Sequence, residues 1–351
     1  MNQGTLSVII SNYNHAHYIT EALEAILTQS CRPLEVIIID DGSTDDSVEV
    51  IQEIALRDPI VHLYLNEQNQ GIWYSANRGL SLAIGAYVYF AAADDRICPG
   101  FFEKSMGLLT QYPQAGLCSA LLQLMGEHGE DKGWIKSPVI SQTPCFLTPN
   151  EVLSTLNRDG FWVTGQTTIL RRNAVLHDAE GFISELSFFA DIFMDLNVAL
   201  RYGACFIPEV LATWRVLDTG YAETIWNDVE LSRAKFDATT QLMRSSKYAA
   251  IFPEDFTRVW ERRGLYGLEM RYYRQLFKKQ IDFFGRLRVL RPKPTPLDMI
   301  FLAILNLLVF FGGFIAKAYL WHRRINWDFP WLLVMLRSRF SKLSRQPANR
   351  K

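Results

Sequence analysis

The chain of 351 residues lacks the glycine-rich loops by which many nucleotide-binding proteins hold phosphate. No GxGxxG follows its first apolar run and no GxxxxGK(S/T) occurs, so we expect neither a dinucleotide-binding Rossmann site nor a P-loop enzyme. Its five cysteines include no CxxC pair, which argues against a zinc site and for a reducing compartment. No basic leader precedes the first apolar run, so we expect a cytoplasmic catalytic part.

Basic residues are scarce in the first 253 positions, which carry 16 Lys and Arg against 30 Asp and Glu. Residues 254–293 carry 11 against 5, and residues 317–351 carry 9 against 1. The net charge of −1 conceals this division. An acidic N-terminal part joined to a basic C-terminal part indicates that the C-terminal part faces an anionic surface, either a membrane or nucleic acid.

Apolar runs typical of buried strands alternate with helical patterns over the first hundred residues. Helices of about a dozen residues separate the runs, which predicts a βαβ series. Right-handed crossovers turn such a series into a parallel sheet covered by helices, so the predicted fold class is α/β. The strand candidates are residues 6–10, 34–39, 60–65 and 87–90.

Polar residues follow each of these strand candidates. Because the carboxyl ends of parallel strands meet at the edge of a sheet where ligands bind, we expect a pocket rich in acceptors. An isolated Asp-Asp pair is more typical of a solvated turn, but adjacent carboxylates also suit a divalent cation that carries a phosphorylated ligand. The polar tips are Asn12, Asp40, Asp41, Asn69, Asp94 and Asp95.

The regular alternation weakens after a predicted helix at residues 102–111. Residues 135–149 contain three prolines and are predicted to form a loop. Apolar spacing predicts a helix at 192–201 and a helical, increasingly basic region at 222–290. Short strand candidates are residues 165–172, 205–210 and 212–216.

An uncharged stretch at residues 299–316 reaches the lower range of length for a transmembrane helix. Tryptophans and basic residues after it are typical of a bilayer interface. Because basic clusters lie on both sides, an in-plane helix or a re-entrant hairpin fits as well as a single span; a buried core helix is the alternative. We therefore predict a catalytic domain at 1–220, a basic helical appendage at 221–296 and a membrane-associated segment with a basic tail at 297–351.

Four segments together resemble one family: SVIISNYN at 7–14, DDGSTDDS at 40–47, NQGIWYSANRG at 69–79 and GAYVYFAAADD at 85–95. In this order and spacing they are similar to the family 2 glycosyltransferases, and the resemblance covers about residues 5–216. It implies the GT-A nucleotide-diphospho-sugar transferase fold. It also implies sugar transfer with inversion of the anomeric carbon from a nucleotide-sugar donor, for which we expect a UDP-sugar.

The resemblance further implies a role for several polar residues. A bound Mg²⁺ or Mn²⁺ would bridge the diphosphate and neutralise charge on the departing nucleoside diphosphate. The implied positions are Asn12 and Tyr13 at the base, Asp40 and Asp41 at the base and ribose, Asn77 at the nucleotide, and Asp94 with Asp95 at the ribose and the metal.

The chain departs from the family pattern at two positions. Ala92 stands where many members have an acid, and Ala76 stands where many have an arginine before the asparagine. The first departure leaves a motif with only the final two acids. Arg78 would replace the missing cation only if its helix presented it inward, which we do not expect.

The general base expected of this family falls in FFADIFMDLNVALRYG at residues 188–203. Asp191 follows an aromatic pair and opens the predicted helix, and Asp195 is the alternative register. Asp191 would also serve as a helix N-cap, a role that is compatible with the first. His15 and His17 are predicted to be loop or capping residues, because no third ligand has suitable spacing for a metal.

These patterns predict a membrane-associated inverting glycosyltransferase whose acceptor is a polysaccharide or a lipid-linked glycan at the cytoplasmic face of a membrane. The main alternative is a catalytically inactive scaffold with the same fold, motivated by Ala76 and Ala92. A nucleotidyltransferase is disfavoured because the first loop has no glycine-rich basic run. We expect no nucleic-acid partner, since the basic residues adjoin an apolar stretch.

Overall fold

The computed structural model describes residues 4–279 apart from positions 136, 218–219, 222–223 and 226–227. The chain divides into two compact units after Leu217. The predicted membrane-associated segment and basic tail at 297–351 lie outside the described residues. Among the helices of the described part, none is both long and apolar enough to cross a membrane.

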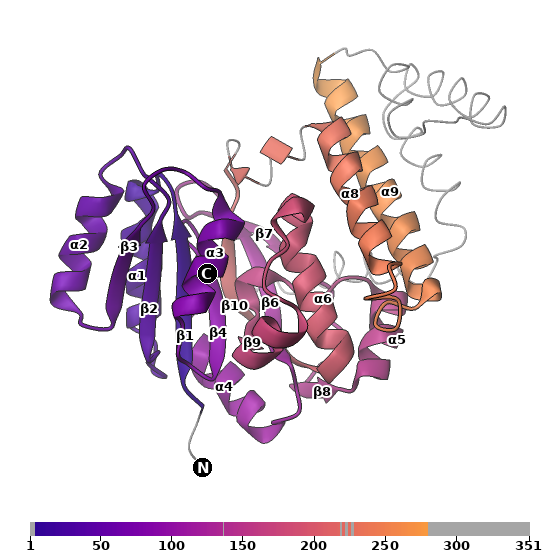
Figure 1. Ribbon diagram of the computed structural model, residues 1–351, viewed down its shortest axis with the longest axis horizontal. Coiled ribbons are helices and arrows are strands. Elements are labelled where there is room, and N and C mark those ends of the chain that lie inside the picture. Colours follow the sequence, from indigo (N-terminus) through magenta and orange to yellow (C-terminus); the bar gives the residue numbers. More distant parts are fainter. Residues whose placement is uncertain (1–3, 136, 218–219, 222–223, 226–227, 280–351) are drawn as a thin grey trace, which may run out of the picture. The chain divides into compact units, whose positions relative to one another are not determined.

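Four parallel strands form one half of the sheet in the first unit, in the order β3-β2-β1-β4 (Figure 1). This confirms the predicted α/β fold. The strands are β1 (Leu6–Asn12), β2 (Glu35–Asp40), β3 (Val61–Leu65) and β4 (Tyr87–Ala92). The crossover helices are α1 (Ala16–Leu27), α2 (Ser47–Arg57) and α3 (Ile72–Leu82).

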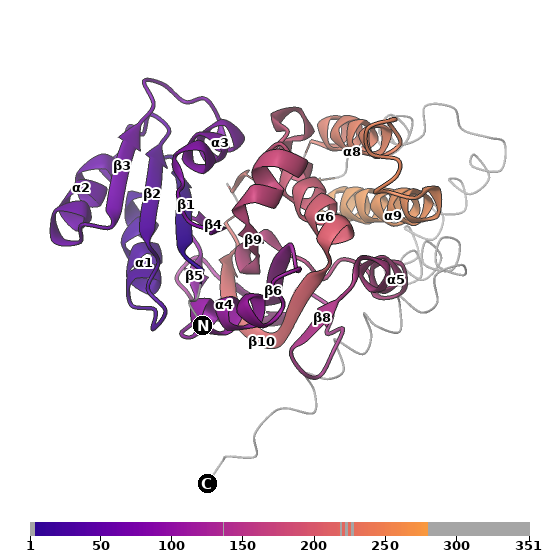
Figure 2. The same cartoon turned by 60° about the horizontal axis from the view of Figure 1, so that its bottom comes forward.

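Helices cover both faces of this parallel half (Figure 2). Alternate residues of a strand point to opposite faces, and Val8 and Ile10 of β1 join the core cluster that contains Ile19 and Leu23 of α1. Ile9, on the opposite face of the sheet, packs against α3, where a Cβ on Gly79 would lie 2.4 Å from the Ile9 side chain. A larger residue at position 79 would therefore push α3 away from the sheet.

The other half of the sheet is mixed. β9 (Ile169–Arg171) lies between β4 and β6 (Leu117–Met125) and is antiparallel to both. β10 (Ala204–Arg215) is parallel to β6. The remaining elements of this unit are β5 (Arg96–Ile97), β7 (Asp131–Ile135), β8 (Cys145–Leu147), α4 (Phe101–Gln111), α5 (Pro149–Asp159), α6 (Ala190–Tyr202), the 3-10 helices Gly165–Thr167 and Ser184–Phe189, and the π-helix Ala174–Asp178.

Three predictions for this half were wrong in detail. The predicted loop at 135–149 contains β8, which pairs with β10. The two strand candidates at 205–210 and 212–216 are one strand, β10, whose register shifts twice between Ile207 and Ala212. Pro208 lies in that interval and has no N–H to donate to a ladder, which accounts for a break in the pattern. Of the candidate at 165–172, only Ile169–Arg171 is a strand.

The second unit contains α8 (Val229–Met243) and α9 (Glu254–Lys279), so the helical prediction for this region is confirmed over the described part. The rings of Phe236 and Trp260 stack at 5.4 Å between centroids, and the indole N–H of Trp260 donates to the hydroxyl of Thr240 across 3.0 Å. A Cβ on Gly264 would lie 2.1 Å from the Phe236 ring. Close approach of the two helices therefore requires glycine at that position.

Candidate functional site

The carboxyl ends of β1 and β2 carry the first two polar side chains of the site. Asn12 and Asp40 are register partners at these ends, and Nδ2 of Asn12 donates to Oδ2 of Asp40 across 2.7 Å. The backbone N–H and the hydroxyl of Ser43 donate to the same carboxylate at 2.9 and 2.7 Å. Asn12 and Asp40 are both buried. These two predicted nucleotide-binding residues therefore lie together in one fixed arrangement.

The loop after β1 is tied to the loop after β2 through Asn14. Its backbone N–H donates to the Ser43 hydroxyl at 2.9 Å, and its Oδ1 accepts the backbone N–H of Thr44 at 2.8 Å. Asn14 adopts a left-handed conformation with φ of 56°, which asparagine tolerates better than most residues. Tyr13 stands at this turn with its side chain 41% exposed, so a predicted base-binding ring is accessible next to the buried pair.

Asp41 differs from its neighbour because its carboxylate binds the protein's own chain. Oδ1 accepts from Nδ2 of Asn66 at 2.6 Å and from the N–H of Gln70 at 3.0 Å, while Oδ2 accepts the N–H of Gly71 at 2.7 Å. Gly71 has φ of 93°, a conformation that favours glycine. Asp41 therefore holds the loop that leads into α3.

Two further residues of α3 are also engaged within the protein. Nδ2 of Asn77 donates to the carbonyl of Phe182 and its Oδ1 accepts the Phe182 N–H, both at 2.8 Å. Arg78 donates to the carbonyl of Leu65 at 2.8 Å and to Asn66, so it is directed toward the end of β3. Asn77, which was predicted to bind the nucleotide, thus fixes the turn at Phe182.

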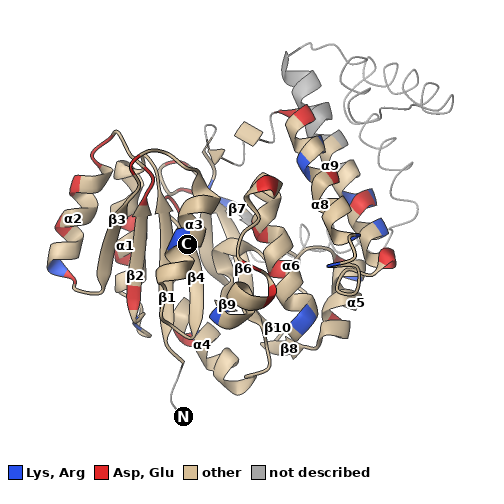
Figure 3. Cartoon of the chain, in the orientation of Figure 1, with Lys and Arg blue, Asp and Glu red and all other residues tan. Residues whose placement is uncertain are grey.

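Asp94 follows β4 at the point where the strand order changes direction. β1 lies between β2 and β4, and Ser11 of β1 pairs with Ala92 of β4. Ligands of open α/β sheets bind in the crevice at such a switch point. Figure 3 shows acidic residues gathered in the loops at this end of the sheet. Asn12, Asp40 and Asp94 therefore lie at the neighbouring tips of β1, β2 and β4 along one edge of the sheet.

Two influences of opposite sign act on the pKa of the Asp94 carboxyl. Burial raises the pKa of Asp94 above its ordinary value, and the neighbouring His15 and Arg215 side chains act in the opposite direction. His15 belongs to the loop after β1 and its N–H donates to the hydroxyl of Ser47 at 3.1 Å. The imidazole that the sequence placed in an ordinary loop is therefore part of the electrostatic surroundings of Asp94.

Asp95 has different surroundings from Asp94. Its side chain is 7% exposed, and its Oδ1 accepts the backbone N–H of Arg215 at 2.8 Å. Asp95 thus connects the turn after β4 to the end of β10. The two adjacent acids, which sequence reasoning treated as one pair, divide into a carboxylate near cations and a carboxylate that binds a neighbouring strand.

The two candidates for the general base lie one turn apart on α6. Asp191 is partly exposed in the first turn, where its Oδ1 accepts the N–H of Ile192 at 2.7 Å, and the N-cap is Phe189 rather than Asp191. The Oδ2 of Asp191 lies 3.6 Å from where a Cβ on Gly165 would stand. Asp195 is 3% exposed, and burial together with the charge of Asp191 raises its pKa well above the usual value.

Comparison with known proteins gives a family match for the first part of the chain. Residues 7–142 match the family described as "Glycosyl transferase family 2". They form a family 2 glycosyltransferase domain. The uncharacterized glycosyltransferase YibD of Escherichia coli is 44% identical over 101 residues, which are 29% of each chain. Across the first curated relatives, the matched region spans between 28% and 44% of the relative's length.

Two solved structures are similar in fold to this chain. TarS 1-349 of S. aureus is 17% identical with a TM-score of 0.54, and the match covers 96% of this chain and 92% of that one. The mannosyltransferase PcManGT of Pyrobaculum calidifontis, in complex with GDP-Man and Mn²⁺, is 16% identical with a TM-score of 0.55, over 99% and 89% of the two chains. The GT-A-like fold expected from the sequence is therefore confirmed.

A divalent ion at this site would need ligands beyond the protein's own side chains. Among the described residues there is no group of three or more His, Cys, Asp or Glu that could hold a metal ion by itself. Mg²⁺ and Mn²⁺ on a diphosphate need only one or two protein carboxylates, because phosphate and water supply the other oxygens. A partly buried carboxyl at the switch point meets that need, so Asp94 fits such an ion.

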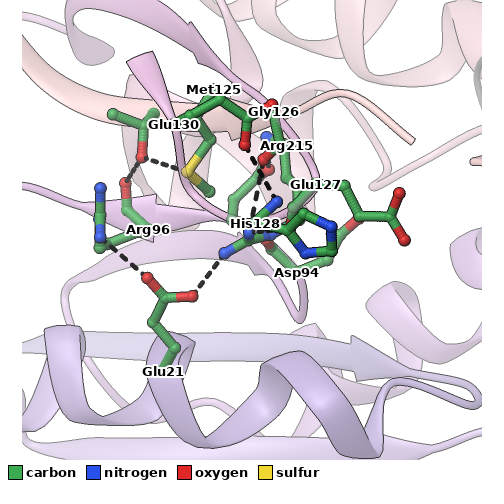
Figure 4. Close-up of polar contacts among 11 residues, drawn as sticks. Glu21, Asp94, Arg96, Met125, Gly126, Glu127, His128, Glu130 and Arg215 are labelled. Carbon is green, nitrogen blue, oxygen red and sulfur yellow. Dashed lines mark hydrogen bonds and ion pairs between the residues drawn. The ribbon is translucent and has the colours of Figure 1, made fainter.

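Arg215 is the residue of the site that sequence reasoning missed. It is the last residue of β10, is 3% exposed and forms an ion pair with Glu21 of α1. Figure 4 shows the Glu21 carboxylate between Arg96 and Arg215, with Arg215 also reaching Asp94 and the turn at Glu127. The only signal in the sequence is a charged residue inside an apolar run, which predicts a partnered charge but not its partners.

Proposed function

We propose that the chain transfers a sugar from a nucleotide-sugar donor to an acceptor hydroxyl, with inversion at the anomeric carbon. The observation that carries this proposal is the meeting of Asn12, Asp40 and Asp94 at the switch point of a family 2 domain. A fixed amide-carboxylate pair there suits the base and ribose of a nucleotide. Tyr13, exposed next to the pair, would pack on the base.

The related folds support a nucleoside diphosphate sugar as the donor. TarS has been crystallised with UDP and with UDP-GlcNAc, and PcManGT with GDP-Man. We propose a UDP-sugar for this chain. Asp41 and Asn77, both engaged with loop backbone, would contribute to nucleotide binding by holding the loops of the pocket.

We propose that Mg²⁺ or Mn²⁺ accompanies the donor and that Asp94 is its first protein ligand. The ion, when bound, would neutralise charge that develops on the departing diphosphate. Asp95 was predicted to share this role. Since its Oδ1 accepts the Arg215 N–H, we assign to Asp95 the support of the turn that carries Asp94.

Asp191 is proposed as the general base. Its carboxylate would take the proton of the acceptor hydroxyl while that oxygen attacks the anomeric carbon and the bond from this carbon to the phosphate oxygen breaks. The electron pair leaves with the nucleoside diphosphate. A base must come within hydrogen-bond reach of the hydroxyl, and Asp191 is partly exposed whereas Asp195 is buried. The lack of a side chain on Gly165 keeps space open beside Asp191.

The competing proposal is a domain that binds a sugar nucleotide without turning it over. It is motivated by Ala92 and Ala76, which occupy positions where many family members have an acid and an arginine. Ala76 is buried in α3, and Arg78 is directed to the end of β3. No arginine of α3 therefore replaces the one missing at position 76.

The enzyme and the inactive scaffold make different predictions for a donor panel. We expect the full chain to bind UDP, and one of a set of UDP- and GDP-sugars, more tightly with Mn²⁺ than without it, and to release nucleoside diphosphate when membrane lipid acceptors are added. Calorimetry measures the binding and a coupled nucleotide assay measures the turnover. Binding that ignores metal, with no turnover of any donor, would support the scaffold instead.

We further propose that the acceptor is a polysaccharide or lipid-linked glycan at the cytoplasmic face of a membrane. The support comes from the sequence, in which residues 317–351 carry 9 Lys and Arg against 1 acid after an uncharged stretch. Such a combination binds anionic membrane surfaces.

Deleting residues 297–351 is therefore expected to release the protein from membranes. The measurement is the distribution of full-length and truncated chains between the pellet and the supernatant after sedimentation with vesicles that contain anionic lipid. Mn²⁺-dependent UDP binding by the truncated chain is the control for folding. A truncated chain that binds UDP and still sediments with vesicles would contradict the anchor.

A further inference from the structure

Arg215 is a buried cation whose guanidinium has several partners. Its Nε donates to the carbonyl of Asp94 at 2.8 Å, its Nη1 donates to the carbonyl of Glu127 at 2.5 Å, and its Nη2 pairs with Glu21. The guanidinium carbon also lies 4.8 Å from the ring centroid of Tyr18. A buried charge is stable only when it is paired and hydrogen-bonded, and these contacts meet that condition.

These contacts join segments that are far apart in the sequence. Tyr18 and Glu21 belong to α1, Glu127 belongs to the turn between β6 and β7, and Arg215 ends β10 (Figure 4). The turn after β4 is held twice, because the backbone N–H of Arg215 donates to Oδ1 of Asp95 while its side chain binds the carbonyl of Asp94. One residue thus fixes both the main chain and the neighbouring side chain of the Asp94 turn.

We propose that Arg215 is a positioning residue that holds the Asp94 carboxylate in place for the sugar diphosphate and its metal without touching either of them. This inference rests on the proposed donor site. The positive charge of Arg215 also acts against the effect of burial on Asp94, so geometry and charge favour the same arrangement. Substituting a residue that orients a metal-binding side chain typically weakens metal affinity by about 10-fold to 100-fold.

The geometry requires arginine rather than any cation. Three acceptors surround different nitrogen atoms of one planar group, and a guanidinium presents its donors in a fixed fork. A lysine has a single ammonium on a flexible stem and cannot serve Asp94, Glu127 and Glu21 at once. Arg215→Lys therefore keeps a positive charge but removes the positioning.

Arg96 provides a matched control in the same network. It binds the other oxygen of the Glu21 carboxylate, at 2.9 Å, from a side chain that is 41% exposed. Exposed ion pairs contribute little to stability. Arg96→Lys removes the guanidinium of the second arginine, leaving the contacts of Arg215 in place.

The test compares Arg215→Lys with Arg96→Lys in the full chain. We expect Arg215→Lys to weaken Mn²⁺-dependent UDP binding by about 10-fold or more, with little change in UDP binding without metal, and to reduce kcat more than it raises KM. Arg96→Lys should change each of these by no more than about threefold. Titration calorimetry with MnCl₂ and UDP measures the first quantity, and thermal unfolding confirms that the variants are folded.

Amide hydrogen exchange separates this inference from the proposed function. Arg215→Lys should speed exchange at residues 93–97 relative to Arg96→Lys, with or without a donor, because the Asp94 turn loses the guanidinium contact to the Asp94 carbonyl and keeps only the backbone hydrogen bond to Asp95. Unchanged exchange there, or metal-dependent UDP binding equal to that of the wild type, would overturn the role of Arg215. Failure of the wild type to bind any nucleotide would instead overturn the proposed function, and exchange would still decide whether Arg215 orders the turn.

Discussion

Asp191→Asn is expected to reduce sugar transfer by on the order of a thousandfold, since general bases contribute rate factors of that size. An amide of the same shape can hold the same place in the first turn of α6, and its Oδ1 can still accept the N–H of Ile192 as the carboxylate does at 2.7 Å. It cannot take a proton from the acceptor hydroxyl. Donor binding should therefore remain within about threefold of the wild type, because the change leaves the proposed nucleotide pocket intact.

The measurement is steady-state transfer together with calorimetric binding of the nucleotide. A variant that binds the donor normally and has lost transfer identifies a base, whereas a variant that has lost both has damaged the pocket. Full transfer by Asp191→Asn would contradict the assignment and move it to Asp195.

Asp195→Asn is the matched control, one turn further along the same helix. Burial and the charge of Asp191 raise the pKa of Asp195 well above its usual value, so the contribution of its protonated form to folding stability is fully present below the unfolded pKa, about 3.9, and is lost as pH rises through the folded pKa. Asparagine is neutral at every pH. Asp195→Asn should therefore gain thermal stability relative to the wild type at pH 8 but not at pH 4, and should retain transfer.

The parallel half of the sheet was predictable because its signals are local. Each strand there is a short apolar run and each crossover helix has its own periodic pattern, so α1 to α3 and β1 to β4 follow from neighbouring residues alone. In the second half, β8 and β9 are 3-residue strands. Such elements exist because they pair with β10 or with β4 and β6, and pairing over this sequence separation leaves no local pattern.

The roles of single side chains were harder to predict than the location of the site. The strand tips were predicted to converge, and Asn12 with Asp40 do pair. Whether a polar residue faces a ligand or the protein's own backbone depends on contacts distant in sequence, such as that of Asn77 with Phe182. A motif specifies residue types in order, and it does not say which of them the fold uses internally.

Asp94→Asn is expected to abolish the metal dependence of nucleotide binding and to reduce transfer by about a hundredfold or more, since carboxylate oxygens are the ligands that Mg²⁺ and Mn²⁺ prefer. Asp94 is partly buried; burial raises the pKa of its carboxyl, and His15 and Arg215 act in the opposite direction. An amide there has one neutral oxygen and would hold a divalent ion weakly. Calorimetric titration of UDP with and without MnCl₂ measures the effect.

Asp95→Asn is the informative comparison for this substitution because the two acids are adjacent. The Oδ1 of an asparagine can still accept the Arg215 N–H that Asp95 binds at 2.8 Å, so this variant should fold and keep most of the metal-dependent binding. If metal dependence were instead lost in Asp95→Asn and kept in Asp94→Asn, the ion would belong to Asp95. The assignment depends on which carboxylate the fold engages internally, because Ala92 leaves the motif with no third acid to share the ion.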